Sequence, residues 1–316
     1  MPETVDDVTQ TVRDLINNPR RLALLIRDDP GAFSQVCSGL DTLGDTEYAV
    51  AAYCEAPNGT DPGQNYLLIY GILQVLFVQQ DAAKDLARAL DVEFVDDAVL
   101  REIRTTRNLS VGHPTDHTSK KQRTFNVIDR GTMSKTSFNL RTRFADGTPP
   151  REQWIDVPAL IGRQREGICR LLSSVVAELE NRELEHRMTF RGTRLQEALP
   201  GVLNYYFEKM YQAVRDSTPE FGAMHVRLAE KAVDELERLV KERDVAGGWD
   251  SFGYEFEQIR YPLAELLIYF TPNGAGRLRA QDADIFISFA QARMQALRAM
   301  AAEVDNQYAR EPTDDS

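Results

Sequence analysis

Residues 66–78 read YLLIYGILQVLFV, and a helix over this stretch would carry apolar side chains on every side. A helix that is apolar all round is buried among several partners or lies in a membrane. The stretch spans 13 residues and ends in Gln79-Gln80-Asp81, whereas a membrane span needs about 18 residues or more. The chain must therefore supply other helices to cover it, which predicts a helical bundle.

Amphipathic patterns elsewhere in the chain could provide this cover. Apolar residues recur at spacings of three and four in residues 156–188, after the helix-start sequence Asp156-Val157-Pro158. The apolar helix itself is expected to extend over 66–90, and a shorter helix is expected at 96–109. Residues 6–54 predict short helices broken at three polar sequences, which are Asn17-Asn18-Pro19, Asp29-Pro30-Gly31 and Leu43-Gly44-Asp45.

Between residues 115 and 145 the hydrophobic period changes from that of a helix to two, which predicts a β-hairpin. The residues expected to face inward are Phe125, Val127, Phe138, Leu140 and Phe144. Arg141 and Arg143 lie on the opposite face, so one side of the hairpin is expected to be cationic. The segment 146–152, DGTPPRE, is expected to close the hairpin.

Beyond a boundary at 190–201, the chain predicts a second helical region. Its amphipathic helices are expected at 202–215, 221–243, 254–269 and 282–308. The expected organisation is N-terminal helices at 1–40, a bundle domain at 41–190, a C-terminal α-helical domain at 195–308 and a disordered tail at 309–316. The expected fold class is all-α, with one inserted β-hairpin.

Several functional classes are disfavoured. The N-terminal sequence MPETVDDVTQ lacks the basic start and apolar run of a signal peptide. Three cysteines without CxxC spacing predict neither a disulfide framework nor a zinc site. The sequence contains no GxxxxGK[ST], HExxH or GxSxG motif. We therefore expect a cytoplasmic protein without a membrane span, a metal or another cofactor.

The net charge of −12 argues against a general nucleic-acid coat protein, but the charge is unevenly distributed. Residues 1–100 carry 6 basic and 17 acidic side chains, whereas residues 101–151 carry 11 basic and 4 acidic ones. This basic island could dock a polyanion, or it could complement acidic segments within the chain or across a dimer. Its candidate phosphate contacts are Arg104, Lys120, Lys121, Arg123, Arg141 and Arg143.

The segment 107–114 places Arg107 and Asn108 at a predicted helix end, with His113 between Gly112 and Pro114. In a continuous helix Arg107 and His113 would point about 240° apart. Gly112 and Pro114 predict that the helix ends first, so His113 can fold back towards Arg107. A histidine can move a proton near neutral pH, and a guanidinium can grip a phosphate and stabilise added negative charge. The alternative is ordinary capping, because such side chains also bond the free carbonyls of a helix C-terminus.

The sequence RNLSVGH resembles the signature of the HEPN superfamily (higher eukaryotes and prokaryotes nucleotide-binding domains), in which an arginine and a polar residue precede a histidine. Asn108 fills the favoured polar position, and the resemblance covers about residues 40–190. It implies an all-α, HEPN-like bundle at 41–190 that dimerises and brings two copies of the motif into one cleft. It also implies a metal-independent ribonuclease of toxin–antitoxin, phage-defence or RNA-processing systems. The hairpin is longer than in a minimal HEPN domain, and residues 195–316 resemble no family known to us.

Three hypotheses follow. In the first, the chain is an endoribonuclease: His113 is the general acid or base, Arg107 stabilises the transition state, and Asn108 orients the phosphate or His113. Attack by the 2′-hydroxyl would leave a 2′,3′-cyclic phosphate, and the partners would be RNA, a second copy of the chain and an antitoxin or regulatory protein. In the second, the HEPN-like fold binds a nucleotide, RNA or a protein without cleavage. In the third, the chain is a helical scaffold, and Arg107 and His113 only cap a helix.

Overall fold

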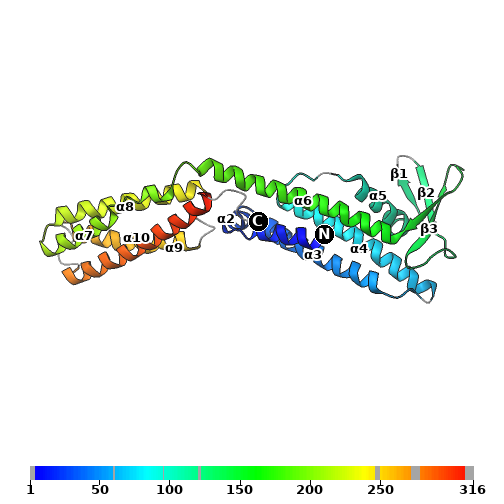
Figure 1. Cartoon of the computed structure of the whole chain (residues 1–316), viewed down its shortest axis with the longest axis horizontal. Helices are drawn as coiled ribbons and strands as arrows, with labels where there is room; N and C mark the ends of the chain where they lie inside the picture. The colour runs from blue at the N-terminus through cyan, green and yellow to red at the C-terminus, as the bar shows by residue number, and fades with distance from the viewer. Residues whose placement is uncertain are drawn as a thin grey trace. The chain divides into compact units, whose positions relative to one another are not determined.

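The computed structural model describes residues 4–59, 61–94, 96–119, 122–245, 250–271 and 278–309. The described chain is mainly helical with one small antiparallel sheet, which confirms the expected α-helical character (Figure 1). The chain divides into two compact units. Unit 1 comprises Met1–Ile16 and Asp28–Glu180, and unit 2 comprises Asn17–Arg27 and Asn181–Ser316.

Unit 1 is built on long helices. They are α1 (Val5–Ile16), α3 (Pro30–Glu55), α4 (Pro62–Ala89), α5 (Ala98–Arg107) and the larger part of α6 (Val157–Phe190). Asp29 and Asp61 cap α3 and α4 by accepting backbone N–H groups, as breaker sequences ahead of helices predict. The break predicted at Leu43-Gly44-Asp45 is wrong, because α3 continues through it. The same helix also runs across residues 40 and 41, where the N-terminal helices were expected to give way to the bundle domain. Leu43 is fully buried there, so core packing outweighs the cost of about 1 kcal/mol for a helical glycine.

The apolar run forms the centre of unit 1. Ile69, Ile72, Leu73 and Leu76 of α4 are each no more than 2% exposed, and they pack with residues of α3, α5, α6 and the sheet. By length and composition α4 is also the one helix among the described residues that could cross a membrane. Burial in the unit 1 core accounts for the face of the run that carries these four residues, whereas Leu67 and Tyr70 of the same run are 75% and 40% exposed.

The sheet has four antiparallel strands in the order β1 (His117–Ser119), β2 (Gln122–Ile128), β3 (Ser137–Phe144) and β4 (Arg151–Asp156). The expected hairpin is present as β2 and β3, whereas β4 was not predicted: its first two residues were expected in the closing segment and Asp156 at the start of the next helix. β4 continues directly into α6, and Asp156 caps that helix by accepting the Ala159 N–H at 2.9 Å.

The inward face of β2 is the reverse of the expected one. Thr124, Asn126 and Ile128 are buried, whereas Val127 is 55% exposed. Asn126 lies inward because its side-chain oxygen accepts a hydrogen bond from the Thr142 hydroxyl of β3 at 2.8 Å. In β3 the expected inward residues Phe138 and Leu140 are fully buried.

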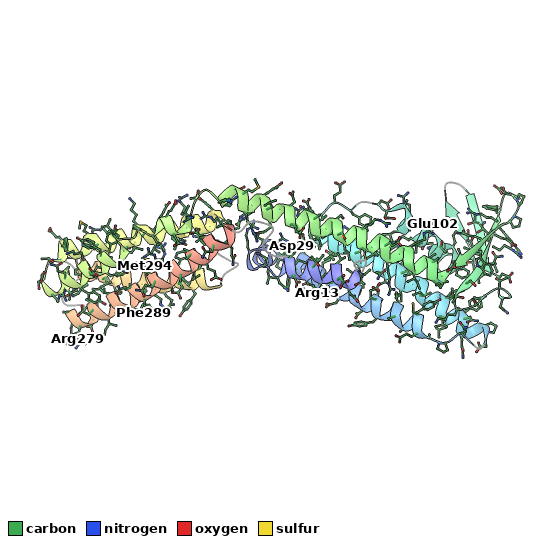
Figure 2. All side chains as sticks on the ribbon, in the orientation of Figure 1. Arg13, Asp29, Glu102, Arg279, Phe289 and Met294 are labelled. Carbon is green, nitrogen blue, oxygen red and sulfur yellow. The ribbon has the colours of Figure 1, made fainter. Side chains whose placement is uncertain are left out.

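Unit 2 centres on a four-helix bundle. Its helices are α7 (Leu203–Arg215), α8 (Pro219–Glu242), α9 (Asp250–Tyr269) and α10 (Ala280–Ala309), close to the expected ranges. Each packs on two neighbours, and α10 buries Met294 in the core while Phe289 stays 42% exposed (Figure 2). Most of α2 (Pro19–Asp28), the end of α6 and the 3₁₀ helix η2 (Leu195–Ala198) belong to the same unit. From residue 310 onward the tail expected at 309–316 lies outside the described residues.

Candidate active site

The Arg107–His113 segment lies where α5 ends. Asp97 caps the start of α5 by accepting the N–H groups of Val99 and Leu100 at 2.7 and 3.1 Å. After Arg107 the backbone widens into one turn of π-helix, η1 (Asn108–Gly112), and the His113 N–H donates to the Asn108 carbonyl at 2.7 Å. Single π turns are rare in proteins overall, but those that occur are often found at functional sites. The helix therefore extends to Gly112, beyond the end expected at residue 109.

The Arg107 guanidinium is held in place by three side chains. Its Nε and Nη2 donate to the Gln74 side-chain oxygen at 3.2 and 2.7 Å, and its Nη1 donates to Asn108 Oδ1 at 2.9 Å. Its Cζ also lies over the ring of Phe77, 4.1 Å from the centroid. An arginine has five N–H donors. Within the described residues, these contacts leave two of them for another acceptor such as a phosphate oxygen.

Gly112 permits this arrangement by its lack of a side chain. A Cβ at Gly112 would lie 2.7 Å from Arg107 Nη1 and 3.4 Å from Asn108 Oδ1. The sequence had indicated Gly112 only as a helix breaker. In the structure its main effect is to let the Arg107 guanidinium lie against the π turn.

Asn108 connects the other two motif residues. Its side-chain oxygen accepts from Arg107, and its backbone carbonyl accepts from the His113 N–H. The structure thus brings Arg107, Asn108 and the backbone of His113 together, with the His113 side chain exposed. The loop that follows is tied to the sheet, because the Asn126 N–H donates to the Pro114 carbonyl at 2.6 Å.

Three of the candidate phosphate contacts in the basic island, Arg104, Arg123 and Arg141, are paired with acids. Arg104 bonds Asp81 at 2.7 Å and also lies over Phe77, with its Cζ 4.0 Å from the ring centroid. Arg123 makes a two-pronged pair with Asp116, at 2.9 and 2.7 Å, which holds the pKa of that carboxyl below its usual value.

The same holds for the cationic face of β3. Arg141 pairs with Glu152, whose pKa is lowered first by the Asn139 amide and then by Arg141. Arg143 is exposed and lies opposite Phe125 in the register. Lys120 and Lys121 lie outside the described residues. The island is therefore partly neutralised within unit 1, although exposed pairs of this kind are weak, about 0–1 kcal/mol, and a polyanion can compete for them.

A buried amide network, which the sequence did not indicate, supports α5 from behind. Gln164 of α6 donates to the Leu76 carbonyl and to Gln79 Oε1, at 2.9 and 3.1 Å, and accepts from Gln80 Nε2 at 2.8 Å. Gln80 also donates to the Leu100 carbonyl of α5 at 3.1 Å. Gln164 and Gln79 are completely buried, so this network links α4 and α6 to the helix that carries Arg107.

No family model, curated protein or solved structure matches this chain. The HEPN resemblance therefore rests on the residues of the motif and stays a prediction.

Proposed function

We propose that unit 1 is a metal-independent endoribonuclease of the HEPN type, with Arg107 and His113 as its catalytic residues and Asn108 as a positioning residue. The observation that carries this proposal is the clamped Arg107 guanidinium, which lies against the π turn leading into the exposed His113 and, within the described residues, keeps two N–H donors available. A rigid donor pair suits a phosphate that gains negative charge in the transition state.

In the proposed reaction the RNA 2′-oxygen attacks the adjacent phosphorus and the bond from phosphorus to the 5′-oxygen breaks. His113 takes the 2′-hydroxyl proton or gives a proton to the departing 5′-oxygen. A second copy of the chain would supply the other proton-transfer group, which is why we include a homodimer in the proposal. The products are a 2′,3′-cyclic phosphate and a 5′-hydroxyl, and the reaction consumes no other reagent.

Asn108 has a more definite role than the sequence alone suggested. Its side-chain oxygen accepts a hydrogen bond from Arg107, so Asn108 acts through the arginine as a positioning residue. Arg104, Arg123, Arg141 and Arg143, with Lys120 and Lys121, would add phosphate contacts that raise affinity without sequence preference. A cytoplasmic location and restraint by an antitoxin or regulatory protein complete the proposal, since an unrestrained ribonuclease would be toxic.

The test is incubation of the purified protein with mixed RNA in EDTA. We expect cleavage with ends that resist phosphatase until acid opens the cyclic phosphate, and loss of cleavage in His113→Ala and Arg107→Ala. Arg101→Ala is the matched control, because Arg101 lies on the same helix but pairs with Asp96 at an exposed position. Absence of cleavage, or equal cleavage by all four proteins, would overturn the proposal.

The alternative of binding without cleavage rests on the same Arg107 donors, which can hold a phosphate whether or not a proton moves. Retained RNA or nucleotide binding with no turnover, lost in Arg107→Ala, would favour it. A helical scaffold would instead show only a stability change in these variants, of about 1 kcal/mol if they remove a cap.

A further inference from the structure

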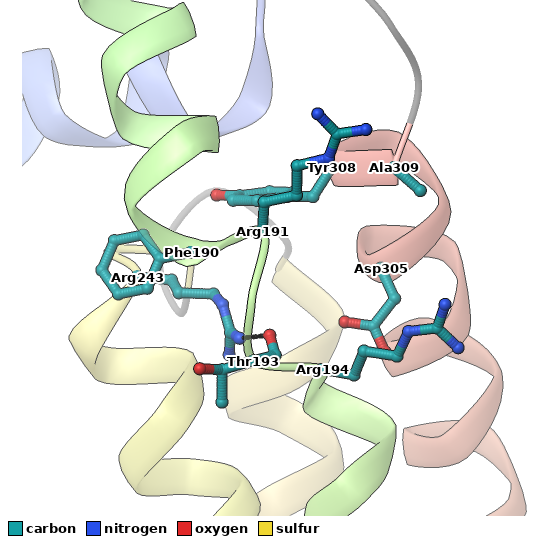
Figure 3. Close-up of a pocket in the computed structure, with 8 residues that line it drawn as sticks. All are labelled: Phe190, Arg191, Thr193, Arg194, Arg243, Asp305, Tyr308 and Ala309. Carbon is teal, nitrogen blue, oxygen red and sulfur yellow. Dashed lines mark hydrogen bonds between the residues drawn. The ribbon is translucent and has the colours of Figure 1, made fainter.

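A pocket of about 200 Å³ lies in unit 2, where the end of α6, the end of α8 and the end of α10 meet (Figure 3). Its lining consists of Phe190, Arg191, Thr193, Arg194, Arg243, Asp305, Tyr308 and Ala309. Three of these residues are arginines and one is an acid. No part of the motif in unit 1 contributes to it.

Arg243 is the unusual member of this lining, because it is a cation that is only 2% exposed. Its Nη2 donates to the Thr193 carbonyl, its Nη1 reaches the Leu239 carbonyl at 3.5 Å, and its Cζ lies over the Phe190 ring at 5.3 Å. Within the described residues no carboxylate lies within ion-pairing distance of it. Burial accordingly lowers the pKa of the Arg243 guanidinium.

Buried charges in proteins are normally paired, because desolvation of an isolated ion is costly. The carbonyls that Arg243 contacts lie at or near helix ends and offer only partial negative charge, about half a unit for a whole helix terminus. Asp305, Glu242 and Glu197 stabilise the Arg243 charge from a distance without pairing with it, so its compensation within the described part of unit 2 is incomplete.

The other ionisable groups around the pocket are already engaged. Asp305 accepts the N–H groups of Leu195 and Gln196 at 2.8 and 3.0 Å, so its oxygens cap η2 rather than pair with an arginine. The Tyr308 hydroxyl bonds His186 Nδ1 at 3.1 Å, and His186 Nε2 bonds the Arg243 carbonyl at 3.1 Å. This chain of bonds fixes the backbone of Arg243, whose side chain lines the pocket.

Arg191 and Arg194 complete the cationic wall. Both are exposed, and Figure 3 shows their guanidinium groups on the α10 side of the pocket, Arg191 next to Tyr308 and Arg194 next to Asp305. Arg243 is fixed by its contacts, and long exposed arginine side chains can reorient towards a bound anion. The wall thus combines one buried guanidinium group with two exposed ones.

We propose that this pocket binds the phosphoryl group of a small phosphorylated molecule, with Arg243 as the fixed contact and Arg191 and Arg194 closing from the mouth. Arginines outnumber acids three to one in the lining, which suits an anionic phosphoryl group. One guanidinium group can bind two phosphate oxygens at once through parallel hydrogen bonds, which favours phosphate over a spherical anion. The volume is smaller than the about 300–1,000 Å³ of pockets for drug-sized ligands, so the phosphoryl group fills it and the rest of the molecule extends outward.

The test uses the full chain and inorganic phosphate at constant ionic strength, with chloride as the compensating salt. Phosphate at about 100 times its Kd should raise the melting temperature of unit 2 by several degrees, about 5 °C or more. Calorimetric titration should give about tenfold weaker binding for Arg191→Ala and for Arg194→Ala. Arg215→Ala, an exposed arginine at the end of α7, is the matched control and should bind as the wild type does.

Arg243→Met tests the fixed contact. If this variant folds, it should lose the phosphate response; if it does not fold, the two exposed variants still decide the question. No phosphate response in the wild type, or an equal response in Arg191→Ala and Arg194→Ala, would overturn the proposal.

A nucleoside monophosphate and its nucleoside identify the source of the phosphoryl group. Tighter binding of the monophosphate than of phosphate indicates an ester, and equal binding indicates the free ion. Binding of the nucleoside as tight as that of its monophosphate would overturn the proposal. None of these measurements depends on RNA cleavage, so this pocket and the ribonuclease proposal can fail separately.

Discussion

The Arg107 guanidinium donates two hydrogen bonds, from Nε and Nη2, to the side-chain oxygen of Gln74 on the neighbouring helix. The central helix α4 therefore sets the position of the arginine that we propose to bind phosphate. A buried hydrophobic helix thus also supplies a polar contact to the candidate site, and this relationship can be tested separately from the fold.

Gln74→Leu removes the acceptor while keeping a side chain of similar length. Because a misplaced catalytic group costs up to about 100-fold in rate, we expect RNA cleavage to fall 10- to about 100-fold. The melting temperature should stay within about 2 °C, since Gln74 is only partly buried. Single-turnover cleavage at saturating protein measures the effect, and Gln10→Leu on an exposed face of α1 is the control. Unchanged cleavage would show that Gln74 does not position Arg107.

Gly112→Ala should affect cleavage more than stability. The new Cβ would displace Arg107 Nη1 from Asn108, but the end of an arginine can move without disturbing the backbone. We expect the free energy of unfolding to change by less than about 1 kcal/mol, because alanine is intrinsically better than glycine in a helix. Cleavage should fall at least about tenfold.

The matched control for that variant is Gly71→Ala on α4, where a Cβ meets nothing within 4 Å. It should leave cleavage unchanged and stabilise the fold slightly, as measured by urea unfolding. A Gly112→Ala protein with full activity would contradict the close approach of Arg107 to the π turn.

Gln164→Leu should destabilise unit 1 strongly, although the new side chain is apolar and similar in size. The substitution leaves Gln79 Oε1 without its buried donor and Gln80 Nε2 without one of its two acceptors, and each unsatisfied group costs about 1–3 kcal/mol. We expect a loss of about 2–4 kcal/mol in urea unfolding. A cost below about 0.5 kcal/mol, similar to that of the exposed Gln10→Leu, would mean that the network contributes nothing.

Asp97→Asn should make the stability of unit 1 less sensitive to a fall in pH. The Arg170 guanidinium first, and then the backbone N–H groups of the cap, hold the pKa of Asp97 below its usual 3.8. A carboxyl whose pKa is lower in the folded state stabilises that state above the unfolded pKa, and this contribution is lost as the pH falls through the folded pKa.

Asparagine keeps the cap but not the charge, so the wild type should be more stable by up to about 1 kcal/mol at pH 6. The difference should shrink below pH 3.8 and disappear at the acid end of the range. Urea unfolding at several pH values measures it. A difference that stays constant down to pH 2 would show that the ion pair is not its source.

The sequence predicted the helices well because their apolar periodicity is long and strong. It failed in β2, where both faces carry a mixture of polar and apolar residues. Periodicity identifies two faces but not which one is buried; that choice depends on partners such as Thr142, which bonds the inward Asn126. The extra helix break at Gly44 failed for a related reason, because packing against α4 decides there.

The motif residues were found from sequence, but their arrangement was not. A π turn is a backbone feature with no compositional sign, and Gln74 lies 33 positions from Arg107 in a run that looks purely hydrophobic. Gln164 and Arg243 were missed because glutamine and arginine on amphipathic helices usually indicate a solvated face. Their burial comes from tertiary packing, which a single sequence does not report.

The junction between β4 and α6 has a consequence for how this chain can change in length. Asp156 ends the strand and caps the helix. The next residue, Val157, is fully buried, and its N–H donates to the Thr136 carbonyl, so the strand and the helix are joined without a loop. One inserted residue would rotate α6 by about 100° relative to the sheet and turn Val157, Leu160 and Ile161 out of the core. The exposed turn at residues 146–150 could absorb the same insertion. The orientation of α6 relative to the sheet is thus fixed by the absence of a loop, and insertions are tolerated at exposed turns rather than at this junction.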